Sequence, residues 1–120
     1  DVCVPISKIT ECVKYAEEQA KKFGVRAPMV GHMGDGNFHV ILPFDPENKE
    51  SYKKIRAFND TLIRKALELN GTITGEHGVG LHKKEYLLEQ HPDNIPVMKS
   101  IKRTLDPNNI MNPGKIFDLN

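Results

Sequence analysis

The chain has 120 residues, of which 38% are hydrophobic and 28% charged, a composition typical of one compact soluble domain. Its 17 Lys and Arg residues nearly balance 16 Asp and Glu residues, and a formal net charge of +1 gives no reason to expect a nucleic-acid partner. No apolar run approaches the ~20 residues that a membrane-spanning helix requires.

The first predicted element is a short strand around residues 2–4, in the sequence "DVCVP". Because the chain runs into this strand without a preceding methionine, we expect a piece of a longer polypeptide. A helix should follow, with Ser7 as its cap and Gly24 at its end. Cys3 and Cys12 lack the spacing of a zinc or redox site, so both are expected to be reduced and mostly buried.

Two strands are predicted within residues 25–32 and 37–44, joined by a Gly-Asp-Gly turn. A two-residue type I′ turn at Asp-Gly would make His32 and His39 direct cross-strand neighbours. Such pairs have Cβ atoms about 4.5–5.5 Å apart, close enough for two imidazoles to bind one metal ion. An ordinary hairpin explains the same segment, and the hairpin alone favours that simpler interpretation.

The remaining elements are a long helix from about residue 49 to 69, a short strand at 72–74, a helix over 81–90 and a last helix capped by Asp93 and ending near Leu105. The order of these elements predicts an α+β fold: strand, helix, strand, strand, helix and strand, followed by two short helices. We expect a ferredoxin-like antiparallel sheet with helices on one face, plus C-terminal short helices.

A second glycine-flanked segment, "TGEHGVG", places Glu76 and His77 in a loop after the strand at 72–74. Its glycines permit backbone conformations in which adjacent side chains serve one site. Two histidines and one carboxylate form a ligand set typical of a divalent transition metal with open positions. In the alternative, Glu76 offsets a helix dipole and His77 is merely exposed. The two loops together favour a metal site.

Three longer motifs carry a family resemblance: "GHMGDGNFHVIL", "GTITGEHGVG" and "LDPNNIMNPGKIF". They resemble, in order and over residues 31–117, the C-terminal part of the FAD-linked oxidases, which include cytochrome-linked D-lactate dehydrogenases, the glycolate oxidase FAD subunit and D-2-hydroxyglutarate dehydrogenases. The resemblance implies that His32, His39 and Glu76 bind a divalent metal, zinc or manganese. It also implies that His77 is the catalytic base and that Asn112 contacts the flavin.

The resemblance further implies that residues 1–120 are a C-terminal substrate or cap domain, with FAD bound mainly by an upstream domain absent from this chain. D-2-Hydroxyglutarate dehydrogenases carry asparagine where this chain has Ile41, so a small D-2-hydroxy acid such as D-lactate is favoured as substrate. Its oxidation to the 2-oxo acid would pass electrons to a cytochrome, a quinone or an electron-transfer flavoprotein.

The implied location is the cytoplasm or the periphery of the inner membrane, mitochondrial in a eukaryote, and the protein is compatible with a homo-oligomer. This chain alone is expected to be inactive.

Two other interpretations stay open. In one, the chain is a ferredoxin-like binding or assembly module with incidental histidines. In the other, it is a metal-dependent hydrolase without flavin, although no nucleophile is evident. His82 and His91 are expected at the surface.

Overall fold

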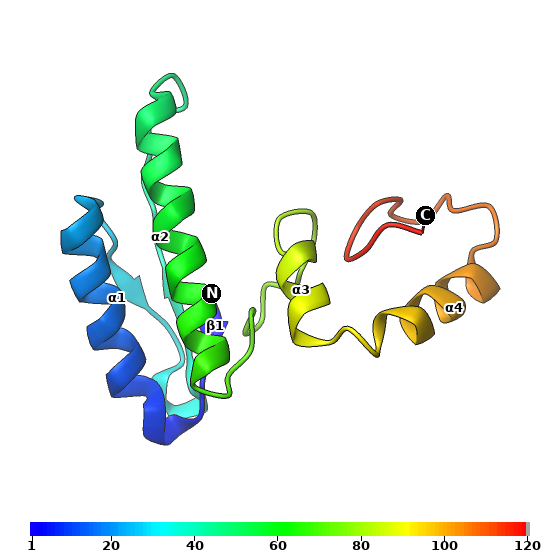
Figure 1. Ribbon diagram of the computed structural model, residues 1–120, viewed down its shortest axis with the longest axis horizontal. Coiled ribbons are helices and arrows are strands. Elements are labelled where there is room, and N and C mark those ends of the chain that lie inside the picture. Colours follow the sequence, from blue (N-terminus) through cyan, green and yellow to red (C-terminus); the bar gives the residue numbers. More distant parts are fainter. Residues whose placement is uncertain (120) are drawn as a thin grey trace. The chain divides into compact units, whose positions relative to one another are not determined.

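The structure is a computed structural model that describes residues 1–119, with an α+β fold of a small three-stranded antiparallel sheet and four α-helices in this part of the chain (Figure 1). It divides into a first unit, Asp1–His77, and a second unit that begins at Gly78. The first unit contains β1 (Val2–Cys3), the 3₁₀-helix η1 (Ile6–Lys8), α1 (Ile9–Phe23), β2 (Met29–Val30), the 3₁₀-helix η2 (Met33–Asp35), β3 (Asn37–Val40) and α2 (Lys49–Glu68). The second contains α3 (Lys84–Gln90) and α4 (Ile95–Leu105).

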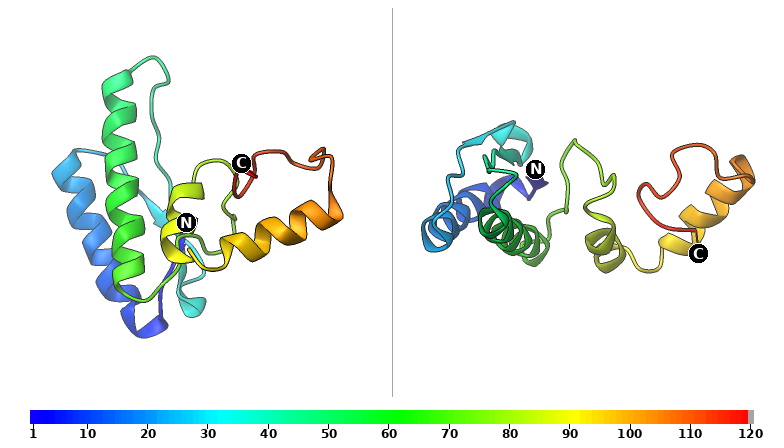
Figure 2. Two further views of the ribbon diagram at one scale, coloured as in Figure 1. Left: turned by 45° about the vertical axis from the view of Figure 1, so that its right-hand side comes forward. Right: turned by 90° about the horizontal axis from the view of Figure 1, so that it is seen from above.

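Helices α1 and α2 lie side by side and cover one face of the sheet, as the view from above shows (Figure 2). Gly24 ends α1 as predicted, with a φ of 64° that a residue with a side chain adopts at a cost. Ser7 is not the cap, because it lies within η1 and Lys8 precedes the α-helix. Between the helices, Phe23 and Phe58 pack edge to face with ring centroids 6.5 Å apart.

The sheet has the order β1-β3-β2, and both pairs are antiparallel. The predicted strand at 72–74 is reduced to one bridge between Thr72 and Cys3. Further along the chain, the backbone N–H groups of Gly75, Glu76 and His77 are bound by the Asp1 side chain and not by a strand. A complete four-stranded ferredoxin-like sheet is therefore not confirmed.

The predicted pairing of His32 with His39 is wrong, because Val30 lies opposite His39. Strand β2 stops at Gly31, which has a φ of 153° and lies so close to β3 that a Cβ there would be 2.6 Å from the Phe38 Cα. The connection is therefore the longer segment 31–36, which includes η2, and both strands are shorter than expected.

The core of the first unit lies between the sheet and the two helices. Its largest fully buried side chains, from both layers, are Phe38, Phe58, Ile63, Ile73, Val2 and Cys12. Phe38 comes from β3, the strand that also carries His39. Because successive side chains of a strand alternate between its faces, burial of Phe38 fixes the direction of its neighbours Asn37 and His39.

In the second unit, α4 begins after Asn94, not at the predicted cap Asp93, and its first turn contains Pro96, whose fixed φ suits that position. Asp106 ends the helix and is buried. Among the described residues, no helix has both the length and the apolar character needed to cross a membrane.

Candidate metal centre

Strand β3 positions the first ligand candidate. Asn37 and His39 are two residues apart and share the strand face opposite Phe38. The His39 side chain is only 18% exposed, and Asn37 is buried. The loop formed by residues 74–77, here called the Gly75 loop, covers this face. Gly75 itself packs so closely that a Cβ would lie 2.0 Å from the Asn37 Oδ1.

Glu76 brings its carboxylate to both predicted histidines. Its Oε1 lies 2.8 Å from the His39 Nε2 and 3.5 Å from the His32 Nε2. Asn37 Nδ2 also donates a hydrogen bond to this oxygen, at 3.4 Å. Donor atoms of one tetrahedral or octahedral ion, each ~2.0–2.2 Å from it, are about 3–3.5 Å apart. The three side chains therefore fit one divalent ion with little rearrangement.

His32 reaches the site from the 31–36 connection and not from a paired strand. The His32 carbonyl accepts a hydrogen bond from Asp35 N at 2.9 Å, and this bond closes the turn of η2. The His32 and His39 ring centroids are 6.2 Å apart with planes at 89°. The predicted proximity of the two histidines is thus present although the predicted register is wrong. Their role as ligands remains a prediction.

The cluster is open on one side. His32 and Glu76 have side chains that are 64% and 49% exposed, whereas His39 is the most enclosed of the three. An ion bound here would retain free positions for water or substrate oxygens, which is the arrangement of a catalytic rather than a structural site. The donor set of two imidazoles and a carboxylate suits zinc or manganese.

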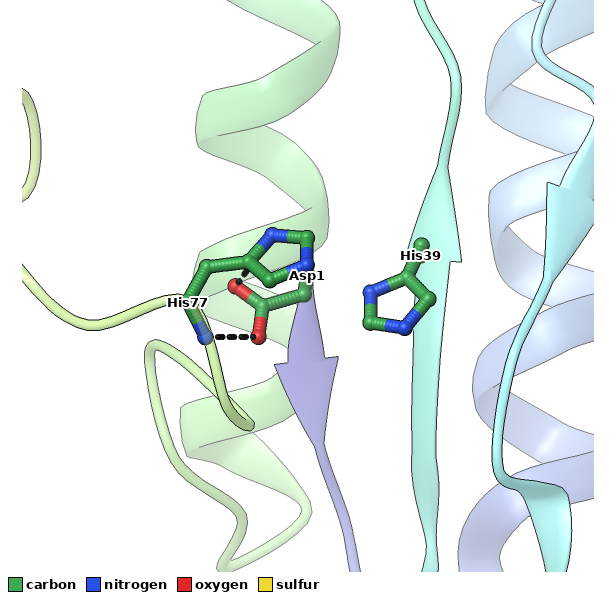
Figure 3. A group of neighbouring side chains, drawn as sticks. All are labelled: Asp1, His39 and His77. Carbon is green, nitrogen blue, oxygen red and sulfur yellow. Dashed lines mark hydrogen bonds and ion pairs between the residues drawn. The ribbon is translucent and has the colours of Figure 1, made fainter.

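His77 lies beside the proposed ligands and points to a different neighbour (Figure 3). Its ring stacks on His39, with centroids 4.5 Å apart and planes only 7° from parallel. Its Nδ1 is 3.7 Å from the Asp1 Oδ1, and the side chain is 60% exposed. The imidazole is therefore held on one side by protein and accessible on the other.

Sequence reasoning missed Asp1 and Asn37. The Asp1 carboxylate, with a side chain that is 0% exposed, binds the backbone of the Gly75 loop. No local pattern predicts a contact between residues more than 70 positions apart. Asn37 carried a usable signal, since strand alternation places it on the face of His39.

Asn112 lies in the second unit, in an exposed turn where its φ is 48° and its carbonyl accepts a hydrogen bond from Lys115 N at 3.2 Å. Its predicted contact with flavin stays a prediction. His82 is exposed, as expected, whereas His91 is half-buried at the end of α3.

Comparison with known proteins identifies related sequences over nearly the whole chain. A family model described as "FAD linked oxidases, C-terminal domain" matches residues 1–116. The chain is 42% identical to "Probable D-lactate dehydrogenase, mitochondrial" of Danio rerio, and 99% of the chain aligns with 24% of that protein. The chain is also 42% identical to "D-lactate dehydrogenase [cytochrome], mitochondrial" of Arabidopsis thaliana, and 98% of the chain aligns with 21% of that protein. The identity to "Glycolate oxidase subunit GlcD" of Bacillus subtilis is again 42%, and 98% of the chain aligns with 25% of that protein. The chain thus spans about a quarter of the length of these relatives.

Proposed function

The chain belongs to the FAD-linked oxidases, as a member of their C-terminal domain family, and from that premise we propose that it supplies a divalent metal site and a base for the oxidation of a D-2-hydroxy acid. The observation that carries the proposal is the convergence of His32, His39 and Glu76 within 4.8 Å of one another. D-Lactate is the favoured substrate because two of the relatives are named D-lactate dehydrogenases.

Each of the three ligand candidates has a separate task. His39, enclosed on β3, fixes the position of the site, while Glu76 adds the negative charge that a divalent cation requires. The exposed His32 completes the set at the open side, where the carboxylate and hydroxyl of a 2-hydroxy acid can lie. A bound zinc or manganese ion would supply Lewis-acid polarisation of these substrate oxygens.

His77 is the residue suited to take the hydroxyl proton. Its Nδ1 faces Asp1, so its Nε2 is the nitrogen available to a substrate at the open side. Stacking against His39 keeps the ring next to the ligands. Loss of this proton to His77, together with the hydride-accepting chemistry that FAD would supply from a part of the full-length protein outside this chain, would convert the hydroxy acid to the 2-oxo acid.

The electron acceptor and location are extensions of the same proposal. A relative from Arabidopsis thaliana is named as a cytochrome-type mitochondrial enzyme. We therefore favour a cytochrome as the acceptor of the electrons from the flavin, and a mitochondrial location if the source is a eukaryote.

A binding or assembly module is the second candidate. It is favoured by apolar side chains that are exposed on and after the sheet strands, among them Val30 and Ile41. This alternative requires association that does not depend on His32, His39 or Glu76. It therefore differs from the enzyme proposal in its response to variants of the site.

The proposal is tested in the full-length flavoprotein with three variants. His77→Ala should retain metal but lower kcat with D-lactate by about 10²- to 10⁴-fold, the usual contribution of a general base. Glu76→Gln should lose both metal and turnover, and the exposed His82→Ala serves as the matched control. Unchanged turnover in His77→Ala would remove its assignment as base. Full metal content in Glu76→Gln would remove the proposed ligand set.

A further inference from the structure

Asp1 makes an unusually dense set of contacts for a carboxylate outside the proposed ligand set. Its Oδ2 accepts hydrogen bonds from three successive backbone N–H groups, those of Gly75, Glu76 and His77, at 2.8, 2.7 and 3.0 Å. Its Oδ1 accepts a fourth, from the Thr74 hydroxyl at 2.9 Å. Because the side chain is fully buried, water does not compete for these bonds.

Three successive N–H groups that converge on one oxygen force the Gly75 loop into a concave shape, of the kind that binds anions in other proteins. In this conformation the adjacent side chains of Glu76 and His77 both reach His39, Glu76 with its carboxylate and His77 with the face of its ring. Glu76 reaches the His32 and His39 nitrogens, while His77 turns toward Asp1 (Figure 3). One carboxylate thus binds the backbone of both residues.

We propose that Asp1 is a positioning residue that holds Glu76 in the geometry of a metal ligand and His77 in that of a base. The inference rests on the proposed function of these two residues. Asp1 itself touches neither the ion nor the substrate in this assignment, because both of its oxygens are occupied by the loop.

His39 supplies an independent reason to place Asp1 in the support of this site. The His39 Nδ1 is buried and has no hydrogen-bond partner, although its Nε2 contacts Glu76. Asp1, His39 and His77 each have a donor atom within 4.8 Å of the others. Loss of a carboxylate that supports a metal-binding site typically lowers metal affinity or activity by about 10–100-fold, and Asp1, which makes no hydrogen bond to His39, would provide this support through the Gly75 loop.

The experiment uses the 120-residue chain and two readouts, neither of which is turnover. In the metal-free chain, amide hydrogen exchange at Gly75, Glu76 and His77 reports the hold of Asp1 on the loop. In a titration with Co²⁺, the visible absorption bands report affinity and coordination geometry. The variants are Asp1→Ala and the nearly isosteric Asp1→Asn, with the exposed Asp93→Asn as the matched control.

Asp1→Ala should lose protection at the three amides, bind Co²⁺ about 10–100-fold more weakly and change the shape of its bands. Asp1→Asn should lie between Asp1→Ala and the wild type, since its single amide oxygen can accept the three backbone N–H bonds without charge, whereas its NH2 group cannot accept the bond from the Thr74 hydroxyl. Asp93→Asn should match the wild type. A folded Asp1→Ala variant with the Co²⁺ affinity and spectrum of the wild type would overturn the inference. In that case Asp1 would affect only the hydrogen exchange of the loop and not the metal site.

Thr74→Val keeps the proposal testable if the Asp1 variants do not fold, since it removes the hydroxyl donor to Oδ1 and leaves the Asp1 carboxylate in place. A several-fold weaker Co²⁺ affinity is expected, and an unchanged affinity would count against the inference. The proposed function fails separately, if the wild-type chain binds no Co²⁺. Wild-type binding that the Asp1 variants leave intact contradicts only the positioning role.

Discussion

At the scale of single residues, the site depends on the close approach of the Gly75 loop to β3. The loop backbone lies directly over Asn37, whose Nδ2 reaches the Glu76 Oε1. A side chain at position 75 would occupy the space of the Asn37 amide. The position therefore requires glycine because of packing, and its sequence context alone suggested only a flexible backbone.

Gly75→Ala should destabilise the first unit by about 1–3 kcal/mol, the usual cost of overpacking, and should weaken metal binding because Asn37 and Glu76 must move apart. Urea unfolding and a metal titration measure the two effects. Gly34→Ala is the matched control, since a Cβ there meets nothing within 4 Å. Equal stability and affinity for Gly75→Ala and Gly34→Ala would show that the close approach is unimportant.

At the scale of elements, the helices were predictable because their signals are local. Asn48 caps α2 by accepting a hydrogen bond from Ser51 N at 3.0 Å, and Gly24 ends α1, both within a few residues of the helices that they limit. The 31–36 connection was not predictable in the same way. The Asp-Gly pair suggests a two-residue turn, but β2 ends before Gly31, which has a φ of 153° and a position so close to Phe38 that it leaves no room for a Cβ.

The candidate site shows the same division. His32, His39, Glu76 and His77 were identified from the sequence as chemically suited residues, and the structure brings all four together. The contacts of Asp1 could not be predicted from the sequence, because its partners are 73 to 76 positions away and no periodicity links them. A local sequence pattern identifies a site residue only when its side chain and its immediate neighbours already suggest a chemical role.

The end of α4 provides a prediction about pH. The Lys102 ammonium first of all, and then the N–H groups of Met111 and Ile110, hold the pKa of Asp106 below its ordinary value. The folded-state pKa is therefore lower than the unfolded-state value of about 3.9, and the unfolded state binds more protons below that pH. The stabilisation is complete above about pH 4 and is lost as the pH falls through the lowered folded-state pKa.

Urea unfolding of the second unit, followed by its amide NMR signals at about pH 6 and about pH 2.5, measures this contribution. The wild type should lose more stability on acidification than Asp106→Asn, which lacks the titrating group. The exposed Asp93→Asn should behave as the wild type. The same pH dependence in Asp106→Asn as in the wild type would assign the effect to other carboxylates.

At the scale of the whole molecule, every residue of the proposed metal centre belongs to the first unit, which also contains the sheet and its core. The chain aligns with about a quarter of the length of its relatives, and the proposed function assigns the flavin to residues outside this chain. Metal binding, in contrast, should be a property of the first unit and should stabilise it.

Cys12 offers a probe of that stabilisation. The residue belongs to α1 and is fully buried, and burial raises the pKa of its thiol to about 11, so it should react with a thiol reagent only after the unit opens. An ion that binds the folded state alone stabilises it by about 2.7 kcal/mol at a concentration of 100 Kd. Labelling of Cys12, followed by mass spectrometry, should slow accordingly. Glu76→Gln should show little slowing, and equal slowing in this variant would place the ion elsewhere.

The central claim is that His32, His39 and Glu76 bind one divalent ion. Anomalous X-ray diffraction tests it most directly, on crystals of the chain grown with zinc and measured on both sides of the zinc absorption edge. We expect one strong anomalous peak about 2.0–2.2 Å from the His32 Nε2, the His39 Nε2 and the Glu76 Oε1. A zinc peak bound by other residues, with these three side chains still joined only to one another, would contradict the claim.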